Sequence, residues 1–349
     1  MARLRYCKEN IKRSLLHQLQ RVLYVTGCTR LHNHMVRPEG AIILMYHSIV
    51  DDNIAPFIHP GYSISMSVFE QQMQLLKNQY NVIDMASLVK KIDNNEKISA
   101  KTVVITFDDG YLNNLQIAAP ILEKYQLPAT LFLCTAYVSR AESQWVDQLH
   151  SMLQFRSCEK INWQDNSSFN LQKDNDFCAF FSLISSQLLI AETEQRKQLL
   201  SQLWDKLQPT REIPKLTMNW DGVRDLKQRY PLFELALHTH EHMDLTRLSS
   251  TQLEQELLDC IQTFEQQLGF KAQFFSYPYG RYNPYIVKKI EQLGLKSAVI
   301  TGPTEAITAK TNKFMLSRYE VTDSMLDLKL WLSGSFPKLP RLLFKRVYP

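Results

Sequence analysis

The chain has 349 residues, of which 45% are hydrophobic, and a formal net charge of +5. This length allows one large domain or two ordinary ones, and no apolar run approaches the roughly 20 residues that span a bilayer. The start lacks the apolar core and cleavage site of a signal peptide, so we expect a cytoplasmic protein. Six cysteines without a C-x-x-C pair argue against a disulfide framework and against a zinc–cysteine site.

Positive charge is concentrated at the two ends of the chain. Residues 1–38 contain eight basic residues and one acidic residue, residues 326–349 contain five and one, and the stretch between them carries a net charge of −6. A nucleic-acid-binding domain carries its basic residues on one folded face, so we expect no nucleic-acid partner. Basic ends suit an anionic membrane surface or an anionic substrate, and peripheral contact with the inner membrane is one hypothesis.

The first predicted element is an amphipathic basic helix over 8–25, which either lies on a membrane surface or packs against its own domain. A buried strand over 41–47 follows and ends at His47, a residue type that is usually structural when it occurs alone. The segment 51–67 has the composition of a loop. After it, the pattern predicts a helix over 68–80, a short strand over 81–84 and a helix over 86–92.

The next predicted strand, over 102–108, is the most informative stretch of the chain. Its residues 102–107 are all β-branched or aromatic, and the run stops at Asp108, Asp109 and Gly110. Adjacent side chains on a strand point to opposite faces, so the two carboxylates can face one site only where the strand ends. Gly110 supplies the backbone freedom for that break. The alternative is a turn that caps the following helix.

A helix over 114–125 and a strand over 129–135 complete a β–α–β unit, which implies parallel strands. From about 140 to 216 the pattern becomes mostly helical, and we interpret this segment as an insertion rather than a separate domain. Its predicted parts are helices over 144–153, 177–190 and 192–207 and an irregular stretch over 157–176. Alternation then resumes with helices over 221–228, 250–268 and 284–293 and strands over 233–237, 273–277, 297–301 and 314–321.

Polar clusters follow the predicted strands. They are His47, the pair Asp108 and Asp109, the run 238–242, the run 277–280, and Arg318. The repeated order of strand and helix predicts a parallel α/β fold. The carboxyl ends of parallel strands lie on one side of a closed barrel or of an open sheet, so we expect these clusters to converge.

The run 238–242 reads H-T-H-E-H. His238 and His242 meet on one face if the chain turns helically there, and imidazoles with a carboxylate are a common ligand set for zinc or another divalent metal. A histidine-rich surface loop is the alternative, but it explains poorly why this spacing accompanies the carboxylate pair at Asp108 and Asp109. His240 is expected to point away from such a site.

These motifs carry a family resemblance. Three motifs resemble, in order, those of the polysaccharide deacetylases, which are the NodB-homology carbohydrate esterases. They are T-F-D-D-G at 106–110, H-T-H-E-H at 238–242 and Y-P-Y-G at 277–280. I-L-M-Y-H at 43–47 and F-E-Q-Q-M at 69–73 resemble the leading part of a bacterial branch of that family. The resemblance covers roughly 40–138 and 217–322.

The resemblance implies an α/β fold, a distorted (β/α)7 TIM-like barrel with a mostly helical insertion. The barrel would span 40–325 with the insertion at about 140–216. A basic amphipathic helix region over 1–39 and a basic aromatic tail over 326–349 would flank it.

The resemblance also implies a divalent metal bound by Asp109, His238 and His242, with Asp108 as the catalytic base. Zn²⁺ is the expected ion, with Ni²⁺ or Co²⁺ as alternatives. The chemistry agrees, because a metal polarises an acetamido carbonyl and lowers the pKa of bound water towards ~7, and Asp108 can then take the proton. The metal and the backbone N–H of Tyr279 are expected to hold the oxyanion.

Two positions depart from the family pattern. Many members have an arginine, which orients the base, at the position of Ser276, and a histidine, which acts as the acid, at the position of Arg318. We hypothesise that Arg318 supplies the guanidinium that position 276 lacks, and that His47 is the general acid; a structural role is the alternative for both. Trp145 and Asp147 are expected to line the sugar cleft, although a tryptophan is also a common core anchor.

The sequence therefore predicts a metal-dependent hydrolase that acts on carbon–nitrogen bonds other than peptide bonds. It would remove N-acetyl groups from an amino sugar of a surface glycan, a polysaccharide or a lipid-linked precursor. One alternative is a non-catalytic sugar-binding protein on the same fold, against which the intact Asp108 argues. The other is a metal-dependent amidase for a small non-sugar amide, which a small closed pocket would favour.

Overall fold

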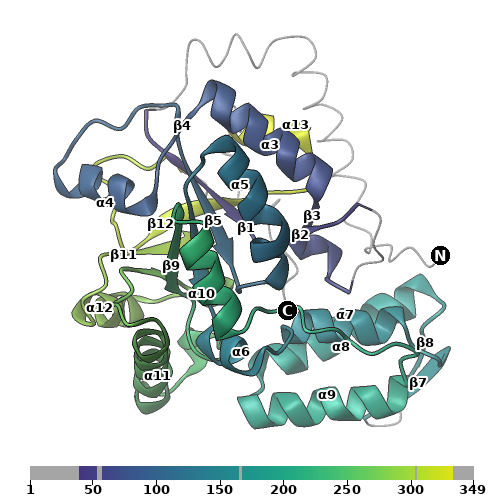
Figure 1. The fold of residues 1–349 in the computed structure, drawn as a ribbon. Helices are drawn as coiled ribbons and strands as arrows, with labels where there is room; N and C mark the ends of the chain where they lie inside the picture. Colours follow the sequence, from purple (N-terminus) through teal and green to yellow (C-terminus); the bar gives the residue numbers. More distant parts are fainter. Residues whose placement is uncertain (1–38, 53–56, 165–166, 303–304, 333–349) are drawn as a thin grey trace.

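The computed structural model describes residues 39–52, 57–164, 167–302 and 305–332 (Figure 1). The amphipathic helix predicted over 8–25 and the tail beyond residue 332 lie outside the described residues. Within the described ranges, every helix is too short or too polar to cross a bilayer.

Seven parallel strands form a closed barrel (Figure 1). They are β1 (Ile42–Tyr46), β5 (Thr102–Asp108), β6 (Ala129–Leu133), β9 (Phe233–Leu237), β10 (Phe274–Ser276), β11 (Ser297–Thr301) and β12 (Leu316–Glu320). Their order around the ring is β1-β12-β11-β10-β9-β6-β5, and pairing of β1 with β5 closes it. The predicted (β/α)7 barrel is confirmed. The short β4 (Asn81–Val82) extends the sheet beyond β5.

Helices cover the outside of the barrel. They are α3 (Met66–Gln79), α4 (Met85–Asp93), α5 (Ala119–Tyr125), α6 (Thr135–Arg140), α10 (Trp220–Arg229), α11 (Ser250–Leu268), α12 (Pro284–Gln292) and α13 (Met325–Leu332). A π-helical turn, Asn114–Ala118, precedes α5. The last helix, α13, takes up the first part of the predicted tail, and its Leu328 and Leu332 are buried in the outer core.

The insertion lies beside the barrel as a separate layer (Figure 1). It consists of α7 (Trp145–Gln154), a hairpin of β7 (Lys160–Trp163) and β8 (Ser167–Asn170), α8 (Asp174–Ile190) and α9 (Thr193–Leu207). The hairpin replaces the irregular stretch expected over 157–176. Only Ile161 and Trp163 of β7 point inward, which is too short an alternation to recognise in the sequence.

The segment that was expected to be a loop over 51–67 also contains regular structure. Its strand β3 (Ser63–Ser65) pairs in parallel with β2 (Ser48–Val50), and a 3₁₀ turn (Pro60–Tyr62) precedes β3. Three-residue strands carry almost no periodic signal, so sequence reasoning missed both.

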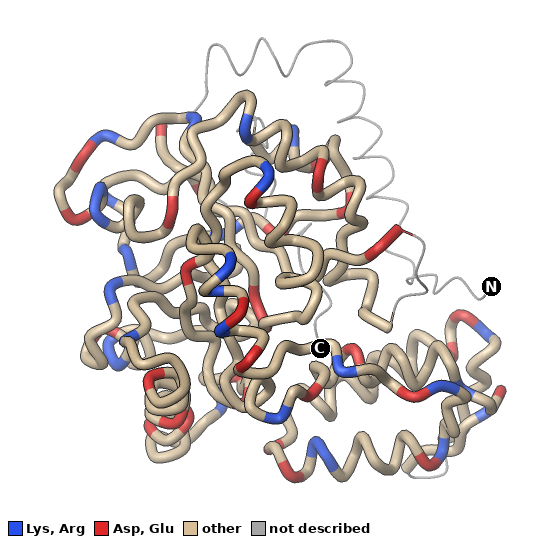
Figure 2. The backbone as a smooth tube through the Cα atoms, in the orientation of Figure 1, with Lys and Arg blue, Asp and Glu red and all other residues tan. Residues whose placement is uncertain are grey.

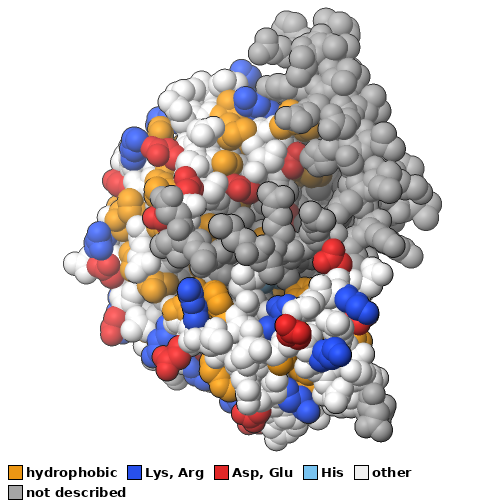
Figure 3. All heavy atoms as spheres, turned by 90° about the vertical axis from the view of Figure 1, so that its right-hand side faces the viewer, with side chains coloured by type: hydrophobic (Ala, Val, Ile, Leu, Met, Phe, Trp, Pro, Cys, Tyr) orange, Lys and Arg blue, Asp and Glu red, His pale blue; other side chains and the backbone are white. Residues whose placement is uncertain are grey.

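Charges of both signs are interspersed along the described backbone (Figure 2). The lower part of the face in Figure 3 likewise shows Lys and Arg side chains next to Asp and Glu side chains. The described surface is therefore of mixed charge.

Each barrel strand contributes one side chain to a buried apolar layer inside the ring: Ile43, Val104, Phe132, Ala236, Phe274, Val299 and Leu316. The alternate residues, such as Leu44 and Leu235, face outward and pack under the helices. Because side chains alternate along a strand, residues two or four positions after this layer also point inward, nearer the carboxyl ends of the strands. The interior layer is thus the floor beneath the functional site.

Candidate active site

Alternation along the strands brings the predicted site residues together. Asp108 lies four residues after Val104, and His238 lies two residues after Ala236. The same two-residue step leads to Ser276, Arg318, Met45 and Cys134 on their own strands. All of them therefore face the barrel interior above the apolar floor, as expected for the carboxyl ends of a closed barrel.

The turn after β5 lets two adjacent carboxylates serve one site. Asp109 and Gly110 both adopt left-handed backbone angles, with φ of 73° and 75°. A Cβ at position 110 would also lie 2.8 Å from a methyl carbon of Leu133, so the turn requires glycine. The reversal keeps Asp109 next to Asp108 instead of on the opposite face of the strand.

The H-T-H-E-H segment is held as a tight loop after β9. Thr239 and His242 have positive φ values, 66° and 51°. One carboxylate oxygen of Glu256, on α11, accepts the backbone N–H groups of His240 and Glu241 at 2.9 and 2.7 Å. The loop thereby returns His242 to the site, and its Nε2 lies 3.2 Å from the Nε2 of His238.

The two histidines are oriented by hydrogen bonds through their Nδ1 atoms. His238 Nδ1 lies 2.8 Å from the backbone oxygen of Ser276, and His242 Nδ1 lies 3.0 Å from the Tyr279 hydroxyl. Both Nε2 atoms therefore face Asp109, each 3.7 Å from its Oδ1. Burial lowers the pKa of both histidines, so they are neutral imidazoles, the form that binds metal.

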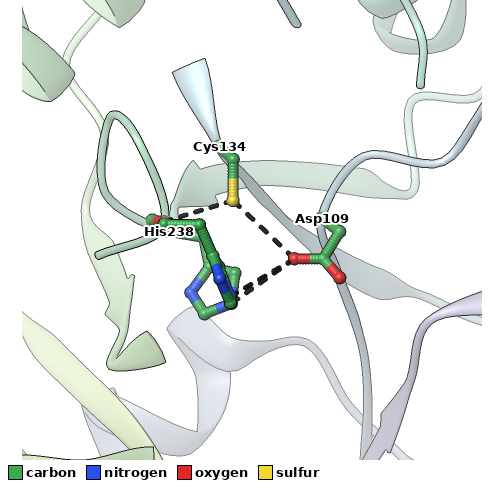
Figure 4. Close-up of side chains that lie close together, drawn as sticks. Asp109, Cys134 and His238 are labelled. Atoms are coloured by element: carbon green, nitrogen blue, oxygen red, sulfur yellow. Dashed lines mark hydrogen bonds and ion pairs between the residues drawn. The ribbon is translucent and has the colours of Figure 1, made fainter. Parts of the chain in front are cut away.

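These side chains fit a divalent metal. Burial and the adjacent Asp108 raise the pKa of Asp109, so a carboxylate there is costly unless a cation offsets its charge. Cys134 Sγ joins the group at 3.7 Å from Asp109 Oδ1 (Figure 4). The four potential donor atoms of Asp109, Cys134, His238 and His242 lie within 4.8 Å of one another. Three were predicted from the sequence, and Cys134 was not.

Asp108 is held by Arg318. The guanidinium donates from Nη1 to Oδ1 at 2.7 Å and from Nη2 to Oδ2 at 2.6 Å, and Arg318 is 1% exposed. Its Nη2 also donates to Ser276 Oγ at 2.9 Å, and that hydroxyl lies 3.3 Å from Asp108 Oδ2. Burial alone would raise the pKa of Asp108, but Arg318 and His238 outweigh it and hold the pKa well below its usual range.

A pocket opens above these residues. It is lined by Met45, His47, Tyr62, Asp108, Asp109, Gln144, Trp145, Val146, His238, His242, Tyr277, Tyr279, Thr301 and Glu320. His47 packs against the ring of Tyr62 at 5.1 Å. Trp145 Nε1 donates to the Tyr279 hydroxyl at 3.2 Å, so it belongs to the pocket wall. Aromatic rings therefore surround a carboxylate-and-imidazole floor.

The Y-P-Y-G segment forms one wall of this pocket. Tyr279 has a φ of 57°, and its backbone N–H has no hydrogen-bond partner among the described residues. Gly280 has a φ of 65°, and a Cβ there would lie 2.8 to 3.0 Å from atoms of Thr301. The turn therefore requires glycine at position 280 and leaves a donor available at position 279.

The prediction that Asp147 lines the cleft is wrong. Asp147 is 0% exposed, accepts from the backbone N–H of His59 at 2.8 Å, and accepts from the Tyr111 hydroxyl at 2.7 Å. Burial raises its pKa to about 7. Asp147 is the third residue of α7, and its hydrogen bond with Tyr111 connects the insertion to the chain just after Gly110.

The insertion also contacts the loop 238–242 that carries the two histidines. Arg196, on α9, donates to the backbone oxygens of Glu241 and Leu188 at 3.2 and 3.1 Å. Arg140 makes a two-pronged salt bridge with Glu241 at 2.7 and 2.8 Å. His240 points away as predicted, with its Nδ1 2.8 Å from Thr135 Oγ1. The insertion therefore helps to hold the loop that carries His242.

Comparison with known proteins identifies the family. A family model described as polysaccharide deacetylase matches residues 95–159 and 169–298. The chain belongs to the polysaccharide deacetylase family. It is 23% identical to the Bacillus subtilis protein YxkH, whose name places it in this family, over 83% of this chain and 74% of that protein. It is 27% identical to a poly-β-1,6-N-acetyl-D-glucosamine N-deacetylase of Staphylococcus aureus, over 55% of this chain and 70% of that enzyme.

Two solved structures share the barrel fold at low sequence identity. The Streptococcus pyogenes deacetylase PplD, solved with acetate, matches 85% of this polysaccharide deacetylase and 99% of its own chain, with a TM-score of 0.56 and 20% identity. IcaB from Ammonifex degensii matches 85% of this chain and 98% of its own, with a TM-score of 0.53 and 16% identity. At the level of the family, the predicted enzyme class, a hydrolase of carbon–nitrogen bonds other than peptide bonds, is confirmed.

Sequence reasoning missed several residues of this deacetylase, among them Cys134, Gln144 and Glu256. Cys134 was detectable in principle, because it lies two residues after an inward-facing phenylalanine on a predicted strand. Gln144 and Glu256 reach the site from the insertion and from α11, and no local pattern marks either. Only long-range packing reveals them.

Proposed function

We propose that this polysaccharide deacetylase is a metal-dependent enzyme that removes N-acetyl groups from an amino sugar of a surface glycan, a polysaccharide or a lipid-linked precursor. The observation that carries the proposal is the different environment of two adjacent carboxylates. Asp108 lies in the fork of Arg318, whereas Asp109 faces the Nε2 atoms of His238 and His242.

Asp109, His238 and His242 would hold the ion, and the neutral imidazoles and the cost of an uncompensated Asp109 charge support this. Zn²⁺ is the proposed ion because two imidazoles and a carboxylate are a common zinc set, with Co²⁺ or Ni²⁺ as substitutes. When bound, the ion would supply Lewis acidity towards the acetamido carbonyl and acidify the attacking water.

Asp108 would act as the general base. Its bidentate pairing with Arg318 keeps it ionised and fixes its direction, and both are needed by a group that must accept a proton from water at neutral pH. A low pKa makes Asp108 a weak base on its own, so its proton transfer depends on acidified water. Arg318 would thereby perform the orienting role that the family usually gives to an arginine at position 276.

The backbone N–H of Tyr279 would donate to the tetrahedral oxyanion, which its lack of a partner among the described residues supports. His47 would protonate the departing amine, since it lines the pocket close enough to act electrostatically on both Asp108 and His242. The charge on the nitrogen would then be neutralised as the carbon–nitrogen bond breaks.

The rings of Trp145, Tyr62 and Tyr279 would bind the sugar, because aromatic faces pack well on pyranose rings. The Staphylococcus aureus relative acts on poly-β-1,6-N-acetyl-D-glucosamine, so oligomers of that polymer are the first substrates to test. A cytoplasmic location with contact at an anionic inner-membrane surface is a further proposal, and only the basic ends of the sequence support it.

The decisive experiment measures acetate release from β-1,6-linked N-acetylglucosamine oligomers by protein stripped with a chelator and then reloaded with Zn²⁺. Reloading should restore turnover, and Asp108→Asn should lower kcat/KM by ~10²–10⁴-fold. Asp221→Asn, a change at an exposed carboxylate on α10, is the control and should leave turnover intact. Zinc binding without turnover on any N-acetylated glycan would favour a sugar-binding protein. Turnover only on small non-sugar amides would favour an amidase.

The role of His47 has its own test. His47→Ala should lose most activity on a glycan amide, whose amine leaves only when protonated, but keep activity on an acetate ester with a good leaving group. Equal activity of wild type and variant on the glycan would exclude His47 as the acid.

A further inference from the structure

Arg196 is a buried arginine that has no carboxylate partner among the described residues. It lies near the start of α9 and is 3% exposed. The Glu241 carboxylate pairs with Arg140 instead. Because a buried charge without a carboxylate partner is costly, the contacts of this guanidinium are informative. It donates to neutral acceptors: the backbone oxygens of Leu188 and Glu241 at 3.1 and 3.2 Å, and the Tyr137 hydroxyl and Met243 Sδ at 3.4 Å each.

Two of these acceptors flank His242, one on each side along the chain. The Glu241 oxygen belongs to the peptide bond that leads into His242, and Met243 follows it. A peptide bond is planar, so fixing its carbonyl oxygen restricts the φ angle of the next residue. His242 has a φ of 51°, in the left-handed region that non-glycine residues rarely adopt. The guanidinium therefore holds the backbone at the point where His242 departs from a relaxed conformation.

The backbone of Glu241 is held from two different parts of the molecule. Glu256, on the barrel helix α11, accepts its N–H at 2.7 Å, and Arg196, on the insertion, donates to its oxygen. His242 Nε2 consequently lies 3.2 Å from His238 Nε2 and 3.7 Å from Asp109 Oδ1. Since α9 packs into the insertion's own apolar core, for example through its Leu200 and Leu203, the position of the guanidinium depends on the insertion as a whole.

We propose that Arg196 is a positioning residue through which the insertion sets the metal affinity of the site. The inference rests on the proposed function, because it assumes that Asp109, His238 and His242 hold an ion. Without the guanidinium, the backbone at His242 relaxes in the metal-free protein, and only a fraction of the molecules present all three ligands together. The apparent dissociation constant rises in proportion to that loss, although every ligand is still present in the chain.

The competing explanation is that Arg196 serves only the stability of the insertion. Its contact with Leu188 supplies a donor to the last turn of α8, where backbone oxygens lack partners within the helix. In that case, replacing Arg196 lowers the stability of the fold but leaves the zinc affinity of the folded protein unchanged. The two explanations therefore differ in a property that does not depend on turnover.

The experiment measures the zinc affinity of chelator-stripped protein by calorimetric titration and the stability of the metal-free protein by urea unfolding. Arg196→Met keeps an unbranched stem but removes every donor, so it should bind Zn²⁺ ~10-fold or more weakly than wild type. Arg196→Lys keeps a charged donor that can reach one acceptor but not several, so its affinity should fall less.

Two control variants separate position from stability. Lys197→Met changes the next residue of α9, which is exposed and pairs with Glu194, and it should bind Zn²⁺ like wild type. Leu76→Ala leaves a cavity under α3, away from the insertion and from the loop 238–242. It should unfold at a lower urea concentration than wild type but keep the wild-type zinc affinity.

Wild-type zinc affinity in the Arg196 variants would overturn the positioning role and leave the proposed deacetylase function intact, whatever the stability of the variants. An equal loss of affinity in Leu76→Ala would overturn it as well, because affinity would then follow stability in general. Failure of wild type to bind zinc would instead overturn the metal-dependent function and the positioning role together. If Arg196→Met does not fold, Arg196→Lys provides the comparison with the two controls.

Discussion

The buried pair of Arg318 and Asp108 can be tested by Arg318→Met, which keeps an unbranched apolar stem and removes the charge. The change deletes the two hydrogen bonds to Asp108, of 2.7 and 2.6 Å, together with those to Ser276 and Thr106, and leaves Asp108 buried without its main partner. Breaking one side of a buried pair costs about 3–5 kcal/mol of unfolding free energy. The loss of the adjacent guanidinium should also move the pKa of Asp108 from below its usual range to above it, because burial, the largest influence in the protein, then acts unopposed by Arg318.

The pH dependence has a definite sign. In the wild type, the pKa of Asp108 is depressed, so its ionised form contributes stability above the unfolded-state pKa of about 3.9, and that contribution is lost as pH falls through the lower folded-state value. In Arg318→Met the folded-state pKa is raised instead, so stability is lost as pH rises through it. The stability deficit of the variant should therefore be smaller at about pH 4.5 than at about pH 8.

Two measurements check this reasoning. Urea unfolding of wild type and Arg318→Met at both pH values gives the deficit, and kcat/KM against pH should show the acidic limb of the variant moved upward by at least about one unit. Arg318→Lys keeps the positive charge but cannot make the bidentate contact with Asp108. It should therefore lower kcat/KM while shifting the acidic limb of the pH profile less than Arg318→Met does.

A swap variant is the sharpest control. Ser276 Oγ already lies 2.9 Å from Nη2 of Arg318, so an arginine at position 276 can reach Asp108 from the other side. The double variant Arg318→Ser with Ser276→Arg should have a higher kcat/KM than Arg318→Met. The acidic limb of its pH profile should also lie closer to that of the wild type. If Arg318→Met unfolds and titrates like the wild type, the guanidinium has no role in holding Asp108.

Three further predictions concern the surroundings of the site. Tyr279→Phe removes the hydroxyl that orients His242, so calorimetric titration should show zinc affinity reduced ~10–100-fold, and unchanged affinity would contradict this role. Gly280→Ala places a Cβ 2.9 Å from a backbone nitrogen of β11 and should lower the unfolding free energy by more than about 1 kcal/mol; Gly269→Ala, with similar φ but no atom within 4 Å, is the control that should lose less. Burial raises the pKa of Glu256 in the folded protein to about 7. The protonated side chain therefore contributes stability that is fully present below the unfolded-state pKa and is lost as pH rises through the folded-state pKa. The stability of Glu256→Gln relative to wild type, from urea unfolding, should therefore rise between about pH 5 and about pH 8 by roughly 1–3 kcal/mol, and a fall would refute the explanation.

Sequence reasoning succeeded where the signal is local. The strand over 102–108 consists of seven buried residues, so its apolar run predicts a buried strand directly. The D-D-G at its end marks the point where side chains stop alternating between the two faces. The contact between Arg318 and Asp108 was predicted from two positions that depart from the family pattern. Position 276 lacks the arginine that many members have, and position 318 carries an arginine instead of a histidine. Both positions follow the inward-facing layer of their strands, so one arginine can take the place of the other. The spacing of His238 and His242 was likewise informative, although positive φ values and not a helical turn bring them together.

The same reasoning failed where the signal is distributed. Asp147 follows Trp145 by two residues on a helix, so the two side chains point in different directions, and only the packed insertion shows which one meets the pocket. The hairpin of β7 and β8 is too short to leave a periodic pattern. Glu256 holds the loop 238–242 from the middle of a surface helix, where a glutamate is ordinarily a solvated residue.

The sequence by itself predicted the barrel, the order of its elements and the convergence of Asp108, Asp109, His238 and His242. It could do so because strand periodicity and strand-end motifs are properties of short segments. Only the tertiary structure decided that Arg318 makes a bidentate contact with Asp108 and that Cys134 lies beside Asp109, His238 and His242. Those contacts join residues that are far apart in the chain, and their distances depend on the register and closure of the whole ring.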